Sequence, residues 1–563
     1  MTTFTLNRRT LLTGTVALGT VGLLAACGGG SDKKISGKAA SSTEEIVKNL
    51  EINKQDRSSL KQGGEFRGSV SAVGPNFNIL TQSGYTTENL TAFGGACNIP
   101  SAIGFTSLSP AGDYSLNDDY VSDYKAETVD GVQTITFKLN SKAVFNDGTP
   151  VDIEAIRAAW TVYRNPDDGY NVIAAPFWQQ VASIDPVDGD KTRVKIVMSK
   201  PLYPAETLGL LGLHPALTDK ELFNNGFVNK PMDQYWSGPF KIGEWNSSAK
   251  TLTLVPNDKW WGEKPKLDRI VVREMADAAA RAAYKNGELD VVESRTLSAY
   301  NEMKDVANSE IRRGRRLFAG GMNLNAEHIT DVAVRKAIFL GIDRGALAKI
   351  RFQGLPYEEE VPGSMLLLGS SQYYRDNYPA RNPEEARKVL EKAGYTKSGD
   401  FYAKDGKTIT LKLTTFGDDA TTKGQAQTFI QSMKEIGINF ELDSRAQSEF
   451  SKVVGNREYD VSISGFGVTS EPTSAAEYFY HSKNWNGVGT PEIDAMVDEM
   501  VTILDDAKRA EKCNEIEKKH MSEVCLFIPF LNGPDFKACR PKLANYGAFL
   551  FKTTDWSTVG WMA

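Results

Sequence analysis

The chain has 563 residues, of which 41% are hydrophobic and 24% are charged. This length suffices for two or three domains, and the composition excludes a disordered chain or a many-span membrane protein. The formal net charge is −6, which gives no support to nucleic-acid binding, because that function normally requires a basic surplus. We therefore expect a multidomain folded protein without a nucleic-acid partner.

The first 26 residues have the pattern of an export signal. Arg8 and Arg9 form a basic start, and the apolar run behind them is shorter than the roughly 20 residues of a membrane span. Leu24-Ala25-Ala26-Cys27 then resembles a bacterial lipobox, in which the cysteine thiol is acylated. We expect residues 1–26 to be removed and Cys27 to anchor the protein at the outer face of the cytoplasmic membrane. An ordinary secretory peptide is the alternative, and the arginine pair leaves the twin-arginine and general export routes open.

A flexible tether and four further cysteines follow. Residues 27–62 contain much Gly, Ser, Lys and Glu, which is typical of a tether. Cys525 and Cys539 flank Asn532-Gly533-Pro534 almost symmetrically, so a hairpin could place them opposite each other, and we predict this disulfide. Pairings that involve Cys97 or Cys513 stay open, because four cysteines allow three connectivities. No Cys/His spacing indicates a metal site, and no cofactor is expected.

Strand and helix signals alternate from residue 63 onward, which predicts an α/β fold. Apolar and polar residues alternate over 134–139, as in a half-buried strand, and Thr149-Pro150-Val151-Asp152 predicts a helix start. Similar patterns predict strands at 251–255, 269–273, 408–414 and 438–442, and helices at 276–285 and 425–436. Gly320 and Gly321, with Asn323 close behind, are the predicted hinge, because paired glycines let the backbone bend.

The chain lacks the motifs of common catalytic sites. None of its four histidines has a metal-binding spacing, and it has no phosphate-binding loop or nucleophile elbow. Acidic pairs such as Asp118-Asp119 lie in turn-like contexts, which favours solvated loop charges over acid–base catalysis. His481 lies beside aromatic residues and is a candidate ligand contact, although a lone histidine is more often structural. We predict a protein that is not an enzyme, with an extracellular hydrolase as an alternative.

Short sequence blocks are distributed over residues 63–563. They include Phe145-Asn146-Asp147-Gly148-Thr149-Pro150, Ser237-Gly238-Pro239-Phe240, Gly287-Glu288-Leu289-Asp290 and Asn382-Pro383-Glu384-Glu385-Ala386. Each block is short, but together and in this order they resemble the peptide/nickel class of bacterial ABC-transporter solute-binding proteins, the dipeptide- and oligopeptide-binding family. The closing stretch 543–549, followed by Asp555-Trp556, resembles an actinobacterial lipoprotein branch of that family.

The resemblance implies a two-lobed periplasmic-binding-protein-like fold of the large peptide-binding class, with the ligand enclosed between the lobes. Lobe I would comprise residues 63–322, with an inserted subdomain, and the returning segment 529–563. Lobe II would comprise residues 323–528. Closure about the hinge would bury the ligand and present a closed surface to an ABC permease and its ATPases.

The resemblance also places the candidate ligand-binding residues. Phe466, Gly467, Val468 and Thr469 stand where peptide-binding relatives resemble Gly-Trp-x-x-Asp, whose acid pairs with the peptide ammonium. Here Phe466 keeps the aromatic platform, while Thr469 replaces the acid, which puts a peptide with a free amino group in doubt. Glu471 is a candidate substitute for that acid. By analogy the further candidates are Asn76, Asn78, Thr81, Glu293 and Arg295.

These observations lead to one expected function and one alternative. The expected function is that of an exported, monomeric, lipid-anchored component of an ABC importer that captures peptides or similar small polar solutes. The missing acidic anchor and the actinobacterial-type tail also support an accessory lipoprotein outside transport. Such a protein would bind an envelope glycolipid or its biosynthetic machinery.

Overall fold

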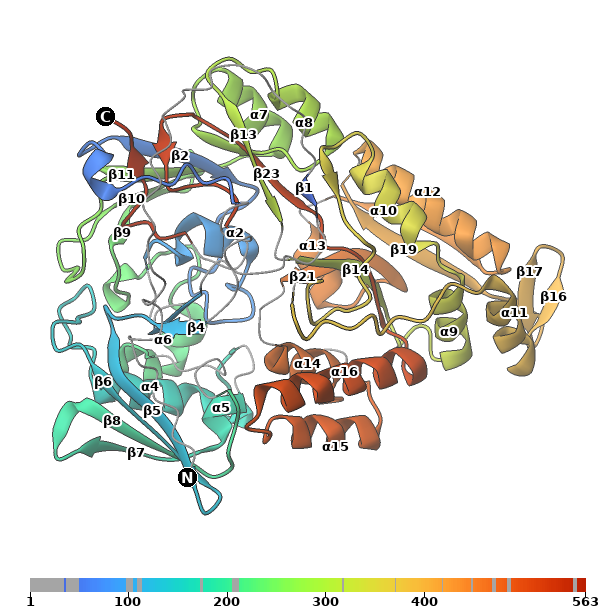
Figure 1. Cartoon of the computed structure of the whole chain (residues 1–563), viewed down its shortest axis with the longest axis horizontal. Coiled ribbons are helices and arrows are strands. Elements are labelled where there is room, and N and C mark those ends of the chain that lie inside the picture. Colours follow the sequence, from blue (N-terminus) through green and yellow to red (C-terminus); the bar gives the residue numbers. More distant parts are fainter. Residues whose placement is uncertain are drawn as a thin grey trace, which may run out of the picture.

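The computed structural model describes thirteen segments of the chain: residues 35–36, 50–97, 105–108, 114–172, 176–204, 212–315, 318–369, 371–417, 419–446, 449–467, 472–483, 488–549 and 554–563. The predicted signal peptide, Cys27 and most of the predicted tether lie outside these segments. Within them, no helix is long and apolar enough to cross a membrane. Helices and strands alternate along the described chain, as the α/β prediction requires (Figure 1).

Lobe I is built on a four-stranded sheet with the order β2-β11-β10-β9. β2 and β11 are parallel, whereas β11, β10 and β9 are antiparallel neighbours. The alternating sequence of β10 buries Leu252 and Leu254 on one side of the sheet, which is the reason that this segment forms a strand. The strands are β2 (Glu65–Val70), β9 (Phe240–Asn246), β10 (Thr251–Pro256) and β11 (Arg269–Glu274).

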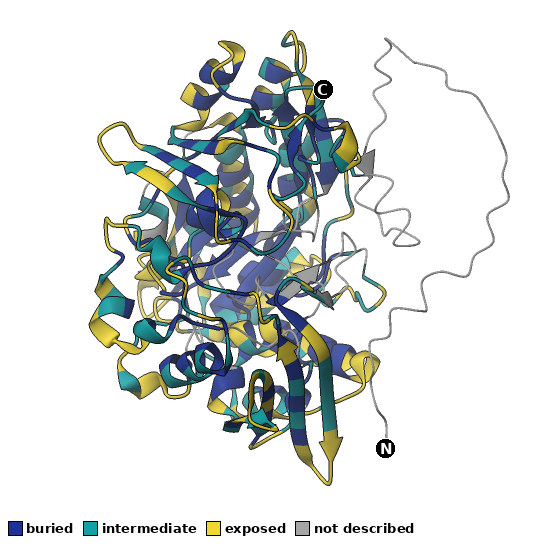
Figure 2. Cartoon of the chain, turned by 90° about the vertical axis from the view of Figure 1, so that its left-hand side faces the viewer, coloured by how far each residue is buried: buried dark blue, intermediate teal, exposed yellow. Residues whose placement is uncertain are grey.

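A subdomain is inserted in lobe I between β2 and β9. Its antiparallel sheet has the order β5-β6-β8-β7, and its hairpins end in exposed tips (Figure 2). The helix α4 (Ile153–Tyr163) packs against β7 and β8 and buries Ile153 and Ile156. The strands are β5 (Val121–Val129), β6 (Val132–Leu139), β7 (Val181–Val187) and β8 (Asp190–Met198).

The start of α4 differs from the sequence prediction. Asp152, rather than Thr149, is the N-cap, and its carboxylate accepts a hydrogen bond from the Glu154 backbone at 2.8 Å. Pro150 instead forms an isolated β-bridge with Val144, which keeps this stretch extended. Because this bridge keeps the residues before Asp152 extended, the helix begins about one turn later than the local cap signal predicts.

A three-stranded sheet with the order β12-β23-β13 joins this lobe to the next one. β23 is its central strand and is antiparallel to both neighbours. The helices α7 and α8 lie beside this sheet at the top of Figure 1. The elements are α7 (Asp277–Lys285), β12 (Val291–Glu293), α8 (Leu297–Met303), β13 (Glu310–Arg315) and β23 (Pro534–Cys539).

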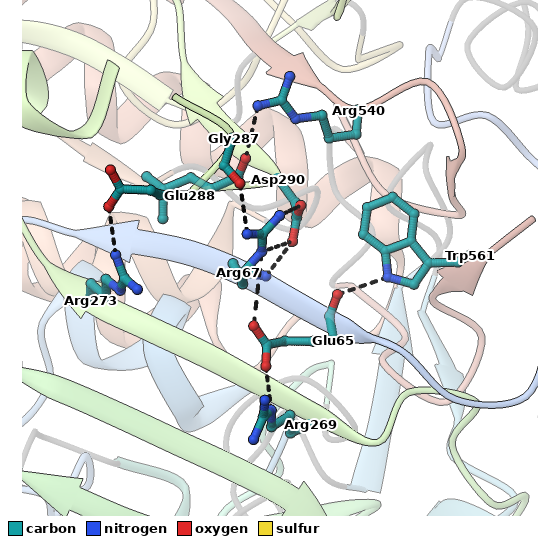
Figure 3. Close-up of polar contacts among 10 residues, drawn as sticks. Glu65, Arg67, Arg269, Arg273, Gly287, Glu288, Asp290, Arg540 and Trp561 are labelled. Carbon is teal, nitrogen blue, oxygen red and sulfur yellow. Dashed lines mark hydrogen bonds and ion pairs between the residues drawn. The ribbon is translucent and has the colours of Figure 1, made fainter. Parts of the chain in front are cut away.

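The Gly287-Glu288-Leu289-Asp290 block has a structural explanation (Figure 3). Arg67 of β2 forms a two-pronged ion pair with the buried Asp290, with Nη2 2.6 Å and Nε 3.1 Å from its two carboxylate oxygens. Arg67 Nη1 also donates to the Gly287 carbonyl at 2.7 Å. The hydrogen bonds to Asp290 raise the pKa of Arg67. This block therefore attaches β12 to the lobe I sheet.

Lobe II is built on a five-stranded sheet with the order β20-β19-β21-β14-β22. β14 is antiparallel to its two neighbours, and the other pairs are parallel. Its strands are β14 (Phe318–Leu324), β19 (Thr410–Phe416), β20 (Asn439–Arg445), β21 (Val461–Gly467) and β22 (Phe527–Leu531). Its helices include α9 (Val332–Gly341), α10 (Arg344–Phe352), α11 (Pro383–Lys392), α12 (Ala420–Glu435), α13 (Phe450–Gly455), α14 (Thr473–Tyr480), α15 (Pro491–Met500) and α16 (Asp506–Glu523).

The described chain changes sheets twice between the lobes. It passes from β13 to β14 between Arg315 and Phe318, and from β22 to β23 between Leu531 and Pro534. The boundaries expected from the resemblance, at residues 322 and 528, fall a few positions away, inside β14 and β22. We call these two passages the crossing.

The expected hinge glycines lie within β14, not in a free connection. Gly320 pairs with Gly465 of β21 and with Leu531 of β22. A Cβ added to Gly321 would lie 2.8 Å from the Ile528 carbonyl oxygen, so close strand packing accounts for glycine there. Asn323 lies in the same strand and is buried. The hinge role of these residues stays a prediction.

The predicted Cys525–Cys539 disulfide is wrong. Both cysteines are free and buried, and Cys525 Sγ donates instead to the Met521 carbonyl at 3.1 Å. The prediction rested on a hairpin around Asn532, but the strands on its two sides belong to different sheets. Burial raises the pKa of each of the two thiols to about 12, as expected of inert core cysteines.

Candidate functional site between the lobes

The two lobes contact each other at the crossing through a small apolar cluster. Leu297, Tyr300 and Ile311 of lobe I pack there with Phe352, Leu355 and Tyr357 of lobe II and with Phe536 of β23. The rings of Tyr357 and Phe536 are 6.2 Å apart in an edge-on arrangement. This cluster brings the start of α8 close to the end of α10.

A second contact joins the inserted subdomain to lobe II. The Tyr203 backbone donates to the Val501 carbonyl at 2.9 Å. The Val501 side chain packs against the apolar cores of both lobes. Among the described residues, both the crossing and this subdomain contact join the lobes.

Two partly exposed tyrosines from different lobes influence each other electrostatically. Tyr85 of lobe I is 54% exposed and Tyr478 of α14 is 36% exposed. Burial nevertheless raises the pKa of both phenols, that of Tyr478 to about 12, and the charge of Tyr85 contributes to the second shift. The charge interaction indicates that the two phenols lie near each other at the boundary of the lobes.

Glu477, next to Tyr478 on α14, has a strongly altered acidity. Burial, and then the negative charge of Asp498, raises the pKa of Glu477 to about 7. A carboxyl group with this pKa is partly protonated at neutral pH, so it can both donate and accept a hydrogen bond.

Asn76, Asn78 and Thr81, predicted as ligand contacts, are buried in a network internal to lobe I. Asn76 Nδ2 donates to Thr81 Oγ1 at 3.0 Å, and Asn76 Oδ1 accepts from the Asn78 backbone at 2.9 Å. Asn78 Nδ2 donates to the Phe223 carbonyl at 2.8 Å. Asn89 completes the network by donating to the carbonyl of Asn76 at 3.0 Å. Their geometry supports a structural role, in contrast with the predicted ligand contact.

Glu293 and Arg295, also predicted as ligand contacts, lie at the crossing. Arg295 Nε is 3.0 Å from Glu293 Oε2, and Lys537 Nζ is 3.7 Å from Glu293 Oε1. Lys537 Nζ also lies 2.8 Å from both oxygens of Asp535. Burial opposes the charge of Lys537, but the carboxylates of Asp535 and Glu293 raise its pKa well above the ordinary value. These four residues form a charged row beside the second passage of the crossing.

Arg351 lies in the last turn of α10 in lobe II, and Arg295 contributes to its electrostatic environment. Its side chain is partly exposed, and no carboxylate of the described chain lies within ion-pair distance of it. Burial, and next the positive charge of Arg295, lowers the pKa of Arg351, whereas Asp419 and Glu359 act in the opposite direction. Sequence reasoning missed this residue, because its position relative to Arg295 depends on the contact between the lobes.

The remaining predicted residues are only partly described. Phe466 and Gly467 end β21, where they pair with Ala319 and Phe318. Val468, Thr469 and Glu471 lie outside the described residues, so their predicted ligand contacts are untested.

His481 ends α14 and is mostly buried. Its two ring nitrogens are each 3.8 Å from a carboxylate of α15, those of Asp494 and Asp498, and Nδ1 accepts from the Lys483 backbone at 3.1 Å. This local bonding is typical of a structural histidine.

The comparison with protein families gives a match over most of the chain. Residues 121–487 match the sequence profile described as bacterial extracellular solute-binding proteins, family 5 middle. The oligopeptide-binding protein OppA of Mycobacterium tuberculosis H37Rv is 28% identical over 527 residues, which cover 91% of this chain and 87% of that protein. The nickel-binding periplasmic protein of Escherichia coli K12 is 22% identical, with coverage of 73% of this chain and 80% of that protein.

Solved structures confirm the two-lobed fold expected from the resemblance. A periplasmic EDTA-binding protein, EppA, has a TM-score of 0.79 at 22% identity, covering 92% of this chain and 99% of its own. The oligopeptide-binding protein AppA of Bacillus subtilis, in complex with a nonapeptide, has a TM-score of 0.74 at 18% identity, with coverage of 90% and 100%. At these identities the likeness shows the fold alone.

Proposed function

Because the chain belongs to the family 5 bacterial extracellular solute-binding proteins, the peptide/nickel class that serves ABC importers, we propose that it captures peptides outside the cell and delivers them to an ABC permease. The observation that carries this proposal is the match to an oligopeptide-binding relative over nearly the whole length of both proteins. The bound solute would lie between the lobes, close to Tyr85, Tyr478 and Arg351.

Closure of the lobes is the proposed mechanism of capture, without covalent chemistry. The two passages of the crossing would act as the hinge, and the contact between Tyr203 and Val501 would form when the lobes close. Asn532 and Gly533 form the described connection at the second passage, and the Glu359 carboxylate accepts hydrogen bonds from both of their backbones, at 2.7 and 3.1 Å. This arrangement would fix one end of the hinge while the lobes rotate about it.

We further propose that the protein is a monomer attached to the membrane by lipid at Cys27. The support is the lipobox-like sequence, since two acyl chains suffice to hold a folded domain at a membrane. Expression of the full chain and of Cys27→Ser in bacteria, followed by membrane fractionation, tests this. We expect the full chain in the membrane fraction and the variant in the soluble exported fraction. Equal membrane retention of the variant would refute the lipid anchor.

The experiment that tests capture is native mass spectrometry of the purified protein, with identification of any ligand released from it. A ladder of co-purified short peptides, or binding from a random pentapeptide library, is the expected result. Binding of a glycolipid together with no binding from the library would overturn peptide capture. That outcome would favour an accessory role in envelope assembly.

A further inference from the structure

Residues 50–57, at the end of the predicted tether, are bound to the folded body. They run antiparallel to the C-terminal part of lobe I. The Tyr546 backbone donates to the Ile52 carbonyl at 3.0 Å, and the Asn545 backbone donates to the Asn53 carbonyl at 3.1 Å. This part of the chain thus has a fixed place on lobe I.

Two residues of the closing stretch 543–549 fit this segment closely. Asn545 Oδ1 accepts from the Gln55 backbone at 2.8 Å, and Asn545 Nδ2 donates to the Gln55 carbonyl at 3.1 Å. A Cβ added to Gly547 would lie 2.2 Å from the Glu51 carbonyl oxygen, so this approach requires glycine. The capture of a solute does not explain these two residues, whereas the binding of residues 51–55 does.

Two consecutive arginines of β13 fix this arrangement beside the crossing. Arg312 is 2% exposed and donates to the carbonyls of Leu543, at 2.7 Å, and Tyr546. The Arg313 backbone donates to Glu51 Oε2 at 2.7 Å, and its Nη2 donates to Glu51 Oε1 at 2.8 Å. Because β13 leads into the first passage of the crossing, Glu51 is attached to lobe I close to the point where the chain enters lobe II.

Leu50, directly before Glu51, belongs to the other side of this boundary. Its side chain packs against the apolar core of lobe II. Farther toward the N-terminus, β1 (Ile35–Ser36) pairs in parallel with β15 (Tyr357–Glu358) of lobe II and lies beside β13 (Figure 1). Two consecutive residues, Leu50 and Glu51, are therefore held by different lobes.

We propose that residues 50–57, which we call the strap, form a further connection between the lobes and hold them in the arrangement in which the subdomain contact is made. Consecutive Cα atoms are about 3.8 Å apart, so Leu50 and Glu51 keep both contacts only over a narrow range of lobe rotation. Opening of the lobes would withdraw Leu50 from the core of lobe II and expose its apolar surface to water. The inference rests on the proposed closure of the lobes but not on the identity of the solute.

Hydrogen–deuterium exchange of the purified protein without added solute tests the strap. The Tyr203 amide donates across the lobes to the Val501 carbonyl, so its exchange reports opening, whereas the Tyr546 amide reports the strap itself. Mass spectrometry of peptic peptides that contain each amide measures both. Leu50→Ser should raise the exchange rate at Tyr203 by about threefold to tenfold, because less apolar surface is then buried in the closed arrangement.

Three further variants show whether the effect passes through the strap. Glu51→Gln weakens the attachment to Arg313 and should also raise exchange at Tyr203. The double variant Leu50→Ser/Glu51→Gln should raise it no more than the larger of the two single effects, because both substitutions break the same connection. Lys54→Ala changes an exposed side chain of the same segment and should leave exchange at Tyr203 unchanged.

The other outcomes overturn the strap without deciding peptide capture. If Leu50→Ser raises exchange at Tyr546 alone, or at neither amide, residues 50–57 stabilise lobe I only. If the Tyr203 amide of the natural protein exchanges without protection, the lobes are open although residues 50–57 are present, and the proposal fails. Because no solute is present in this experiment, its failure is distinct from a failure of the peptide library to bind.

Discussion

The loop of residues 73–89 and the crossing both contribute polar groups near the boundary of the lobes, but they use them differently. In the loop, Asn76, Asn78 and Thr81 are buried and hydrogen-bonded to one another and to lobe I. At the crossing, Arg351 is partly exposed and has no carboxylate within reach in the described chain. Unused hydrogen-bonding capacity, and not polarity alone, therefore distinguishes a candidate ligand contact from structural support.

The largest effect is expected when the loop network is broken at Asn89. Its amide accepts from the Gly74 backbone at 2.9 Å and donates to the carbonyls of Asn76 and Gly84 at 3.0 Å each. Asn89→Ala leaves the Gly74 amide and the buried Asn76 carbonyl without this partner, while the Gly84 carbonyl keeps its bond from the Thr86 backbone at 2.9 Å, so the free energy of unfolding should fall by about 3 kcal/mol. Urea denaturation measures this change.

A control substitution in the same lobe tests whether the loss of stability is specific to the loop network. Asn225→Ala removes an exposed amide that bonds to Glu221, and it should change the free energy of unfolding by less than about 0.5 kcal/mol. Equal effects of Asn89→Ala and Asn225→Ala would contradict the structural role of the loop and return its residues to the ligand site.

A smaller effect is expected at Glu477 of α14, whose raised pKa makes the stability of the fold depend on pH. Its pKa in the folded protein is about 7, above its ordinary value near 4.5, so the folded state holds a proton that the unfolded state releases. Stability that depends on this proton is fully present below about pH 4.5 and is lost as the pH rises through 7.

Glu477→Gln should therefore remove part of the pH dependence. Between pH 5 and pH 8 the natural protein should lose about 2 kcal/mol more unfolding free energy than the variant, after allowance for partial exposure. Urea denaturation at both pH values measures the difference. Asp498→Asn, which removes the second cause of the shift, should act in the same direction with a smaller size. An identical pH dependence of Glu477→Gln and the natural protein would show that Glu477 is not buried as described.

Much of the fold could be predicted because its signals are local. The strand predicted at 251–255 is β10, the one at 269–273 is β11, and the helix predicted at 276–285 is α7. Alternation and helical periodicity follow from burial on one side of each element, and a sequence shows them directly.

The predictions failed where the answer depends on which sheet a strand joins. The segments on either side of Asn532 have the pattern of a hairpin, but β22 pairs in lobe II and β23 pairs in lobe I. The predicted disulfide failed for this reason. A turn signal cannot show that the chain leaves one lobe and enters another at that point.

The candidate site shows the same limit. Glu293 and Arg295 were identified because they follow a recognisable strand, and the structure places both at the crossing. Arg351 was missed, because its lack of a partner arises from Glu359 and Asp419 bonding elsewhere. Contacts among segments so distant in sequence are not visible in any one of them.

The smallest effect is expected at the subdomain contact. This contact connects the lobes at a second place, in addition to the crossing. Val501→Ala removes two methyl groups that pack against both cores, so it should weaken the closed form relative to an open one. Affinity for a peptide that the protein binds should fall by about threefold to tenfold, as measured by calorimetry. Val332→Ala, at an exposed position of lobe II, is the control and should leave the affinity unchanged. If Val501→Ala binds the peptide as tightly as the natural protein, the subdomain contact does not contribute to closure, and the crossing alone sets the arrangement of the lobes.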